Sequence, residues 1–330
     1  MPEEAARRDT PIPAGQADYL IATAARAPSV HNTQPWRFRV GEYAIELYAD
    51  PRRKLRVDQI GREMLISCGA ALFGLRLAVR SLGYQPVVEP LPDPARLRLL
   101  ARVTLGAAEP MTARERQLLE ALPHRHTHRG PFAPGPLPTG LVAGLQHDAL
   151  AEGTELVLVD EVIAYQRLAG IADAAERRQD LDPVARAELR RWSRAPADPA
   201  HDGIPAHAFP ASGGRQPGQL PQRDFDQGRG LGLLPGGGPP PAATAVLVTP
   251  GDGRADWLRA GQALHRLLAH AAASWVFASL HTQPLEAGAT RALIQDRLAL
   301  PGVPQMLLQL GPAHTTRSTA RRPPADLIDP

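Results

Sequence analysis

The segment APSVHNTQPW, residues 27–36, is the stretch that decides the fold. It follows a short helix predicted at residues 18–25, which its proline and serine would end. Its hydroxyl and amide groups could donate and accept hydrogen bonds along one face of a planar ligand. Serine, asparagine and glutamine also favour turns for local reasons, so a capped turn is an equally good interpretation from these residues alone.

The residues that follow this segment predict an α+β half. Residues 36–40 and 43–49 alternate apolar and polar side chains, as the two strands of a hairpin do. Residues 63–82 are apolar around most of a helix circumference and too many for a strand, so we expect a buried central helix. Two further strand-like stretches, residues 85–89 and 97–105, complete the half.

A related order of elements begins again near residue 113. The expected elements are helices at 139–151, 257–279 and 287–298, and strands at 155–159, 244–249 and 304–310. The chain is therefore predicted to consist of two related halves, residues 1–112 and 113–330. With 330 residues, each half is long enough to bury its own core.

Residues 195–243 interrupt the pattern of the second half. Here 20 of 49 residues are glycine or proline, and neither the strand nor the helix period survives. Irregular segments of this length inside a domain are usually functional or disordered. A lid over a binding site, with residues 202–205 as a candidate cover, and a surface crossover between two strands are both open interpretations.

Charge and cysteine content limit the classes of partner and compartment. The net charge is only +3, and basic and acidic residues are mixed along the chain, so nucleic acid is not an expected partner. There is no uninterrupted run of about 18 apolar residues, so no membrane span is expected. The single cysteine, Cys68, lies among small residues of the predicted central helix, which suggests a packed thiol in a cytoplasmic protein.

The segment HRHTHR, residues 124–129, is the second candidate site. In an extended chain Arg125, Thr127 and Arg129 share one face and could bind a phosphomonoester through guanidinium and hydroxyl donors. The three histidines share the other face, so a metal site is a geometric alternative. A solvated basic loop is the third interpretation. Near the C-terminus, Arg321 and Arg322 by themselves indicate only a flexible basic tail.

Together these segments resemble the nitroreductase superfamily of FMN enzymes, and more closely its two-domain actinobacterial branch related to the Acg proteins. The family carries an A-P-S-x-x-N-x-Q-P-W segment at a helix end, which residues 27–36 match. Its phosphate segment, R-R-[ST]-x-R, is matched at residues 125–129, except that His126 replaces the second arginine. The resemblance continues through residues 62–72, 280–286 and 304–308 and covers most of the chain.

The resemblance implies a nitroreductase-like fold with one FMN site between the halves, so that one chain forms a pseudo-dimer and needs no oligomer. It assigns ring contacts to the first motif, phosphate contacts to the second, and further contacts to the 282–283 turn and the C-terminal arginines. The residues implied in cofactor binding are Pro28, Ser29, Asn32, Gln34, Arg125, Thr127, Arg129, Thr282, Gln283, Arg321 and Arg322. No catalytic acid, base or metal ligand is implied.

The activity implied is hydride transfer from NADH or NADPH through FMN to a nitroaromatic or quinone-like acceptor, with the flavin supplying the chemistry. The alternative is an FMN-storage protein with little turnover, in which part of residues 195–243 closes the flavin site.

Overall fold

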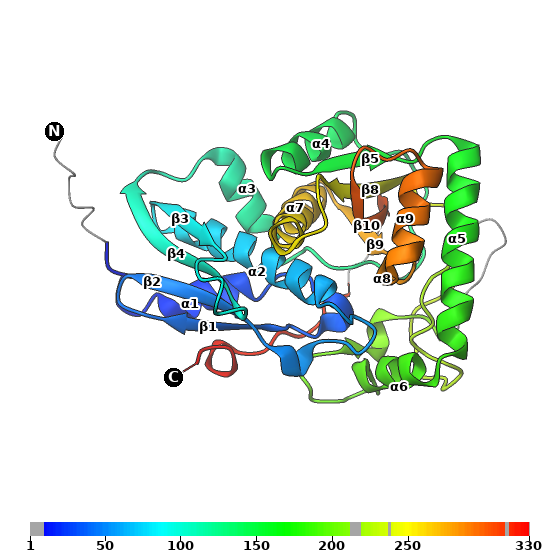
Figure 1. Ribbon diagram of the computed structural model, residues 1–330, viewed down its shortest axis with the longest axis horizontal. Helices are drawn as coiled ribbons and strands as arrows, with labels where there is room; N and C mark the ends of the chain where they lie inside the picture. The colour runs from blue at the N-terminus through cyan, green and yellow to red at the C-terminus, as the bar shows by residue number, and fades with distance from the viewer. Residues whose placement is uncertain (1–9, 212–218, 237–238, 314–316, 330) are drawn as a thin grey trace.

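Two four-stranded antiparallel sheets, each with a long buried helix, form the framework of the protein (Figure 1). The computed structural model describes residues 10–211, 219–236, 239–313 and 317–329. The α+β class predicted from the sequence is confirmed.

The first sheet has the strand order β1-β2-β4-β3, with α2 connecting β2 to β3. Its elements are α1 (Ala17–Ala24), β1 (Trp36–Val40), β2 (Ala44–Ala49), α2 (Arg62–Ser81), β3 (Tyr84–Pro90) and β4 (Leu99–Ala108). Each predicted element of this half is present, with ends shifted by no more than a few residues.

The second sheet has the order β5-β8-β10-β9, with α7 connecting β8 to β9. Its elements are α3 (Ala113–Ala121), α4 (Leu141–Ala151), β5 (Glu155–Leu158), β8 (Ala243–Thr249), α7 (Arg254–Ala273), β9 (Val276–Leu280), α8 (Gln283–Glu286), α9 (Gly288–Arg297) and β10 (Val303–Pro312). In both sheets the chain therefore runs through a first and a second strand, a long helix, and a third and a fourth strand. The fourth strand inserts between the second and third in each case.

The helix predicted at residues 257–279 is wrong at its C-terminal end. Helix α7 ends at Ala273, Trp275 adopts the left-handed conformation with φ of 54°, and Val276 begins strand β9. An apolar run suits a buried strand as well as a buried helix, so periodicity did not reveal the boundary.

The two long helices α2 and α7 pack against each other at two glycines. A Cβ on Gly69 would lie 2.2 Å from the carbonyl oxygen of Leu258, and a Cβ on Gly261 would lie 1.9 Å from that of Ile66. Real Cβ atoms do not approach so closely, so only glycine permits this spacing of the two backbones. The two halves thus share one core through their central helices.

No membrane span was expected from the sequence, but helix α2 is long and apolar enough to cross a membrane, by length and composition alone. However, 83% of the apolar window is buried inside the protein, as expected of a core helix. It is the only such helix among the described residues. Cys68, on this helix, is fully buried, which confirms the packed thiol.

An insertion between β5 and β8 holds α5 (Val162–Leu181), α6 (Pro183–Trp192) and the short parallel pair β6 (Ser193–Arg194) and β7 (Ile204–Pro205). The irregular part of the insertion has a small buried cluster of its own, which includes Phe209 and Phe225. The carboxylate of Asp226, fully buried, accepts hydrogen bonds from the backbone N–H groups of residues 230–232. Local hydrogen bonds replace regular structure in this part of the insertion.

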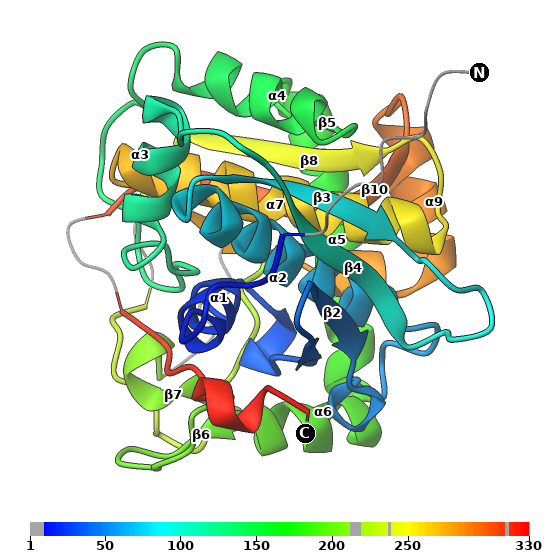
Figure 2. The ribbon, with the colours of Figure 1, turned by 90° about the vertical axis from the view of Figure 1, so that its left-hand side faces the viewer.

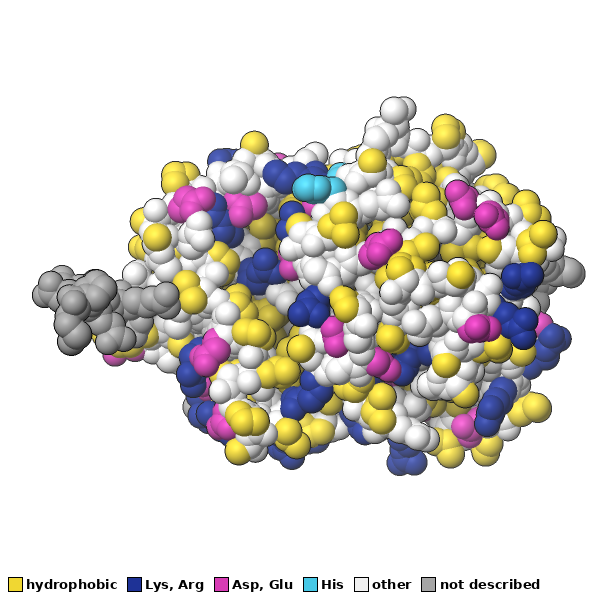
Figure 3. Space-filling model, turned by 45° about the horizontal axis from the view of Figure 1, so that its top comes forward, with side chains coloured by type: hydrophobic (Ala, Val, Ile, Leu, Met, Phe, Trp, Pro, Cys, Tyr) yellow, Lys and Arg dark blue, Asp and Glu magenta, His cyan; other side chains and the backbone are white. Residues whose placement is uncertain are grey.

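The C-terminal tail returns to the first half. The backbone N–H of Phe38 in β1 donates to Leu327 O at 2.8 Å, and the N–H of Asp329 donates to Phe38 O at 2.7 Å. Figure 2 shows the tail (red), with η4 (Pro324–Asp326), below α1. On the face drawn in Figure 3, arginine and acidic side chains are interspersed rather than gathered by sign.

Candidate active site

A cavity lies where the two halves and the insertion meet. It is lined by the loop after α1, the first turns of α2, residues 127–129, the end of β9 and part of the insertion. Polar and aromatic residues in its lining are Ser29, His31, Glu63, Ser67, Thr127, Arg129, Gln222, Arg223, Phe225, Ser279, His281 and Thr282. Apolar side chains such as Ile66, Leu264 and Met306 complete the wall. The chemistry of this lining suits a planar ligand with polar edges.

The loop of residues 27–36 has an unusual backbone. His31, Asn32 and Gln34 have positive φ angles of 48°, 54° and 50°, a region that side chains other than glycine rarely occupy. The hydroxyl of Ser29 accepts the Gln34 N–H at 3.0 Å, and the hydroxyl of Ser67 in α2 accepts the Val30 N–H at 3.4 Å. These bonds hold the loop against the cavity, with Pro28 and Ser29 in its lining.

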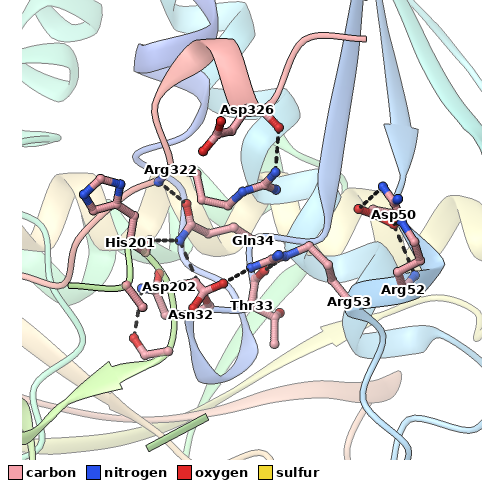
Figure 4. A network of polar contacts seen from close by, with 12 residues as sticks. Asn32, Thr33, Gln34, Asp50, Arg52, Arg53, His201, Asp202, Arg322 and Asp326 are labelled. Atoms are coloured by element: carbon pink, nitrogen blue, oxygen red, sulfur yellow. Dashed lines mark hydrogen bonds and ion pairs between the residues drawn. The ribbon is translucent and has the colours of Figure 1, made fainter. Parts of the chain in front are cut away.

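The side chains of Asn32 and Gln34 do not line the cavity. Their amides bind the insertion and the tail instead (Figure 4). Asn32 Nδ2 donates to Gly203 O at 3.0 Å, and Gln34 Nε2 donates to His201 O at 2.7 Å. Gln34 Oε1 accepts the backbone N–H of Arg322 at 2.9 Å. Asn32 and Gln34, which were predicted to contact the ring, therefore join the loop of residues 27–36 to the insertion and to the tail, behind the cavity wall.

Arg53 reinforces this junction (Figure 4). Its Nε donates to Thr33 O at 2.5 Å, and its Nη2 pairs with Asp202, which also pairs with Arg194. Burial alone would raise the pKa of Asp202, but the two guanidinium groups outweigh burial and lower it. Residues 202–205, the proposed cover, are thus fixed to the first half, and the insertion lines the cavity with residues 210, 222, 223 and 225.

Three arginines form a cationic cluster beside the cavity: Arg125, which is buried, and Arg129 and Arg321, which are partly buried. Burial lowers the pKa of each, and the neighbouring arginines lower it further, so that the pKa values of Arg129 and Arg321 fall to about 10. Arg125 donates one bond, to Arg26 O at 2.9 Å, while its Nε and Nη1 have no hydrogen-bond partner. Arg321 Nε also has none within the described part of the chain.

Among the described residues, the charged neighbours that perturb these guanidinium groups are other arginines, and no carboxylate is among them. Buried charged donors without partners are costly, and like charges held close together add to that cost. A phosphate group would satisfy the free N–H donors and neutralise the cluster. Thr127 and Arg129 line the cavity, whereas Arg125 does not, and the shared phosphate contact of these residues stays a prediction.

Arg322 lies apart from this cluster. Its guanidinium Nη2 donates to Asp326 O at 2.5 Å, and its pKa is lowered by burial and by Arg53 and Arg37. The structure therefore brings Arg321, but not Arg322, to Arg125 and Arg129.

The three histidines of residues 124–129 have separate surroundings. His124 stacks on Trp275, with ring centroids 6.0 Å apart, while His128 Nε2 lies 2.9 Å from Pro131 O. Burial and Arg125 lower the pKa of His126 to about 3. No group of three His, Cys, Asp or Glu side chains that could hold a metal ion occurs within the residues described.

The turn at residues 282–283 is divided between two environments. Thr282, the residue before α8, lines the cavity, and its hydroxyl accepts a bond from Arg223 Nη2 at 3.3 Å. Gln283 is buried but does not belong to the lining.

Arg223 is a site residue that the sequence did not indicate. Coming from the insertion, it contacts His31 Nε2 at 2.9 Å and Glu286 Oε1 at 2.7 Å, and so spans the cavity between the two halves. Phe225 packs edge-on against His31, at 5.6 Å between centroids, and beneath the Arg129 guanidinium at 5.5 Å. Burial, Arg223 and Arg129 lower the pKa of His31, which keeps its imidazole neutral. An arginine in an irregular segment carries no pattern that would predict this role.

Glu63, also missed, lies in the first turn of α2. Its carboxyl is 3% exposed, lines the cavity, and has no hydrogen-bond partner on either oxygen in the described structure. Burial raises its pKa well above the ordinary value, and Glu286 adds to the effect. A charged residue on the wall of an otherwise apolar helix is the signal that could have revealed it.

The fold and site define a two-sheet α+β protein with a cavity between its two halves and a cluster of arginines beside that cavity. No protein-family model matches the chain. The chain is 36% identical over 298 residues to the Mycobacterium tuberculosis protein named "Putative NAD(P)H nitroreductase Rv3131", covering 88% of this chain and 83% of the relative. It is 30% identical over 321 residues to "Putative NAD(P)H nitroreductase acg" of the same organism, covering 96% of each.

The chain therefore belongs to the nitroreductase family, in the branch that includes Acg and Rv3131. Among solved structures, a "putative nitroreductase" from Anabaena variabilis aligns with a TM-score of 0.48 at 12% identity, covering 88% of this chain and 82% of that one. A nitroreductase with bound FMN from Desulfitobacterium hafniense aligns with a TM-score of 0.41 at 13% identity, covering 64% and 97%. The family resemblance expected from the sequence is confirmed.

Proposed function

We propose that the chain binds one FMN in the cavity and is an NAD(P)H-dependent oxidoreductase acting on nitroaromatic or quinone-like acceptors. The observation that carries the proposal is the cluster of Arg125, Arg129 and Arg321. Arg125 and Arg321 have N–H donors without partners among the described residues, and Arg129 lines the cavity, which suits a phosphate at the cavity's edge. Family membership supports the same cofactor.

The ring would lie between the loop of residues 28–31 and the turn at Thr282, both of which line the cavity. Asn32 and Gln34 would hold that loop in place from behind, through their bonds to residues 201–203 and to the tail. When bound, FMN supplies reversible two-electron hydride chemistry, and the protein's residues bind and orient it.

We propose one site per chain, formed as in a pseudo-dimer. The equivalent sheets support two related halves, and the two motifs for ring and phosphate each occur once. The cytoplasmic location expected from the sequence stays a prediction.

A second candidate is FMN storage with little turnover. Arg223 and Phe225 favour it, because both come from the insertion and occupy the cavity wall with ionic and aromatic contacts to each half. The insertion would then act as a lid that limits access of a second substrate to the ring.

The first test is the binding of FMN itself. Purified protein should bind one equivalent of FMN per chain, measured by flavin absorbance and by titration of flavin fluorescence. An Arg129→Ala variant should bind at least about tenfold more weakly, because a charge-assisted donor is lost. The matched control, Arg116→Ala on the exposed surface of α3, should bind as the wild type does. Absence of FMN binding by the wild type would refute the proposal.

Turnover separates enzyme from storage. Anaerobic mixing of the FMN-loaded protein with excess NADH or NADPH should bleach the flavin band if the protein is an oxidoreductase. If the band persists in the wild type but bleaches in an Arg223→Ala variant, the insertion limits access and storage is the better description. Oxidation of the reduced protein by a nitroaromatic or a quinone would then identify the acceptor class.

A further inference from the structure

The carboxyl of Glu63 lines the cavity. Both of its carboxyl oxygens are free of hydrogen bonds within the described residues, although the side chain is almost completely buried. The Ser67 hydroxyl, one turn along α2, donates to the backbone carbonyl of Glu63 and not to its carboxyl. Because a buried polar group without a partner is costly, this carboxyl has the geometry of a ligand contact.

The two nearest cations are already engaged. Arg62 Nη2 forms an ion pair with Glu63 Oε1 at 3.5 Å but no hydrogen bond, while Arg62 Nη1 donates to Gln305 O and Oε1 at 2.9 and 3.1 Å. Arg223 is held by Glu286 at 2.7 Å, across the cavity.

The charged groups that face Glu63 come from three elements. Asp58 and Arg62 lie at the N-terminal end of α2, Glu286 lies in α8, and Arg223 lies in the insertion. Burial and two acidic neighbours favour the neutral form of the carboxyl more than the two arginines favour its ionised form, so its pKa is raised well above the ordinary value. These influences together favour the neutral form of the Glu63 carboxyl.

A neutral carboxyl has one O–H donor and one carbonyl acceptor, side by side. Its complement is a group that offers an acceptor and a donor with the same spacing, namely an –NH–C(=O)– edge. An ionised carboxylate, which only accepts, would face the carbonyl of that edge with a repulsive charge.

We propose that Glu63, as a neutral carboxylic acid, binds the –NH–C(=O)– edge of a planar heteroaromatic ring in the cavity, donating to its carbonyl and accepting from its N–H. This inference rests on the proposed function. Two ligands have this chemistry: the pyrimidine edge of the flavin, and the carboxamide of the nicotinamide donor. Apolar residues such as Ile66 and Met306 would contact the ring face.

Three variants test the proposal. Glu63→Met removes both hydrogen bonds at similar volume, Glu63→Gln keeps an uncharged donor and acceptor, and Asp58→Asn removes a neighbouring carboxyl that does not line the cavity. The apo Glu63→Met protein should melt no lower than the wild type, because it loses an unpartnered buried group. This measurement separates a binding defect from misfolding.

The FMN arm measures dissociation constants of the apo proteins by flavin fluorescence. At pH 7 we expect Glu63→Met to weaken FMN binding about tenfold, and Glu63→Gln and Asp58→Asn to change it by less than about threefold. As the pH rises and Glu63 ionises, wild-type affinity should fall, while Glu63→Gln should lack that additional fall.

The nicotinamide arm uses FMN-loaded protein and NAD⁺ or NADP⁺, whose binding perturbs the flavin spectrum without reaction. If Glu63→Met weakens the binding of FMN alone, Glu63 contacts the pyrimidine edge of the flavin. If it weakens the binding of the oxidised nicotinamide nucleotide alone, Glu63 contacts the carboxamide. Wild-type behaviour of Glu63→Met in both arms would overturn this inference while leaving the proposed function intact, provided that Arg129→Ala still weakens FMN binding. Failure of the wild type to bind FMN would overturn both.

Discussion

The two halves of the molecule have the same core connectivity but differ in their connections, two of which bear on the candidate site. Between α1 and β1 the first half has the long loop of residues 25–35, whereas between α4 and β5 the second half has only residues 152–154. Between β1 and β2 the first half has the short link of residues 41–43, whereas between β5 and β8 the second half carries the insertion of residues 159–242. One half therefore supplies the motif loop and the other supplies the insertion that meets it.

This difference teaches how two sheets of the same connectivity can frame a cavity with two unlike walls. The sheets and central helices hold the halves together, and the variable loops carry the site residues. In the second half, residues 152–154 are too few to form a loop like that of residues 27–36, so an equivalent second cavity has no such wall. The comparison yields four predictions, in order of decreasing effect.

The helix junction should tolerate no side chain at Gly261. Valine there would place its Cβ within 1.9 Å of the Ile66 carbonyl oxygen, so Gly261→Val should lower the free energy of unfolding by about 3 kcal/mol or more. In contrast, Gly170→Ala on α5, where nothing lies within 4 Å, should raise it by about 0.5–1 kcal/mol. Urea unfolding measures both, and equal effects would show that the halves do not depend on this contact.

Binding and stability should change in opposite directions at Arg125. Arg125→Met should weaken FMN binding by about 2 kcal/mol, roughly thirtyfold, because charge-assisted bonds to the phosphate are lost. The same change should stabilise the apoprotein, since it removes a buried cation repelled by Arg129 and Arg321. Arg116→Met, at an exposed position, is the control. Melting curves with and without FMN check both effects, and a less stable apoprotein would contradict the account of the cluster.

Acid should weaken the junction through His265. This buried histidine of α7 donates Nδ1–H to Ala70 O of α2 at 2.6 Å, and burial lowers its pKa to about 3. As pH falls below about 6.5 the unfolded state takes up a proton that the folded state refuses, so stability decreases by up to about 1.4 kcal/mol per pH unit. His265→Met should remove the contribution of His265 to the pH dependence of the free energy of unfolding between about pH 6.5 and about pH 4. If the free energy of unfolding of the wild type and of His265→Met changes with pH in parallel, His265 is not the origin of the acid destabilisation.

The smallest effect is expected where the motif loop meets the insertion. Gln34→Leu should speed hydrogen exchange in residues 201–203 and 320–322, since it removes the bonds to His201 O and to the Arg322 N–H. FMN affinity should fall by a few-fold, because the loop that lines the cavity is less well held. Gln117→Leu, on the exposed surface of α3, should leave both measurements unchanged. Unchanged exchange in Gln34→Leu would show that other contacts hold the insertion.

Much of the fold was predictable because its helices and strands have distinct hydrophobic periods. The central helix was expected at residues 63–82 and is observed at Arg62–Ser81. The boundary at Trp275 was not predictable, since the apolar residues on either side of it fit both a helix and a strand. The insertion between strands β5 and β8 was recognisable from its glycine and proline content, but its internal packing around Asp226 was not.

The candidate site, like the fold, was predictable from the sequence only in part. Arg125 and Arg129 were selected because their spacing places both side chains on one face of an extended chain. Arg321 joins them and Arg322 does not, a distinction that depends on how the tail crosses the first half. Arg223 and Glu63 face the same cavity from positions 160 residues apart, so only folding could bring them together.

The sequence by itself determined the family, the α+β class and the two motifs, because these are properties of local residue patterns. The tertiary structure decided what those residues contact. Asn32 and Gln34 fit the family motif, yet their amides bind the insertion and the tail, since these segments supply the nearest backbone partners. The cavity's unpaired carboxyl and guanidinium groups also appear only in the folded chain, because burial and hydrogen-bond partnership depend on contacts between distant segments.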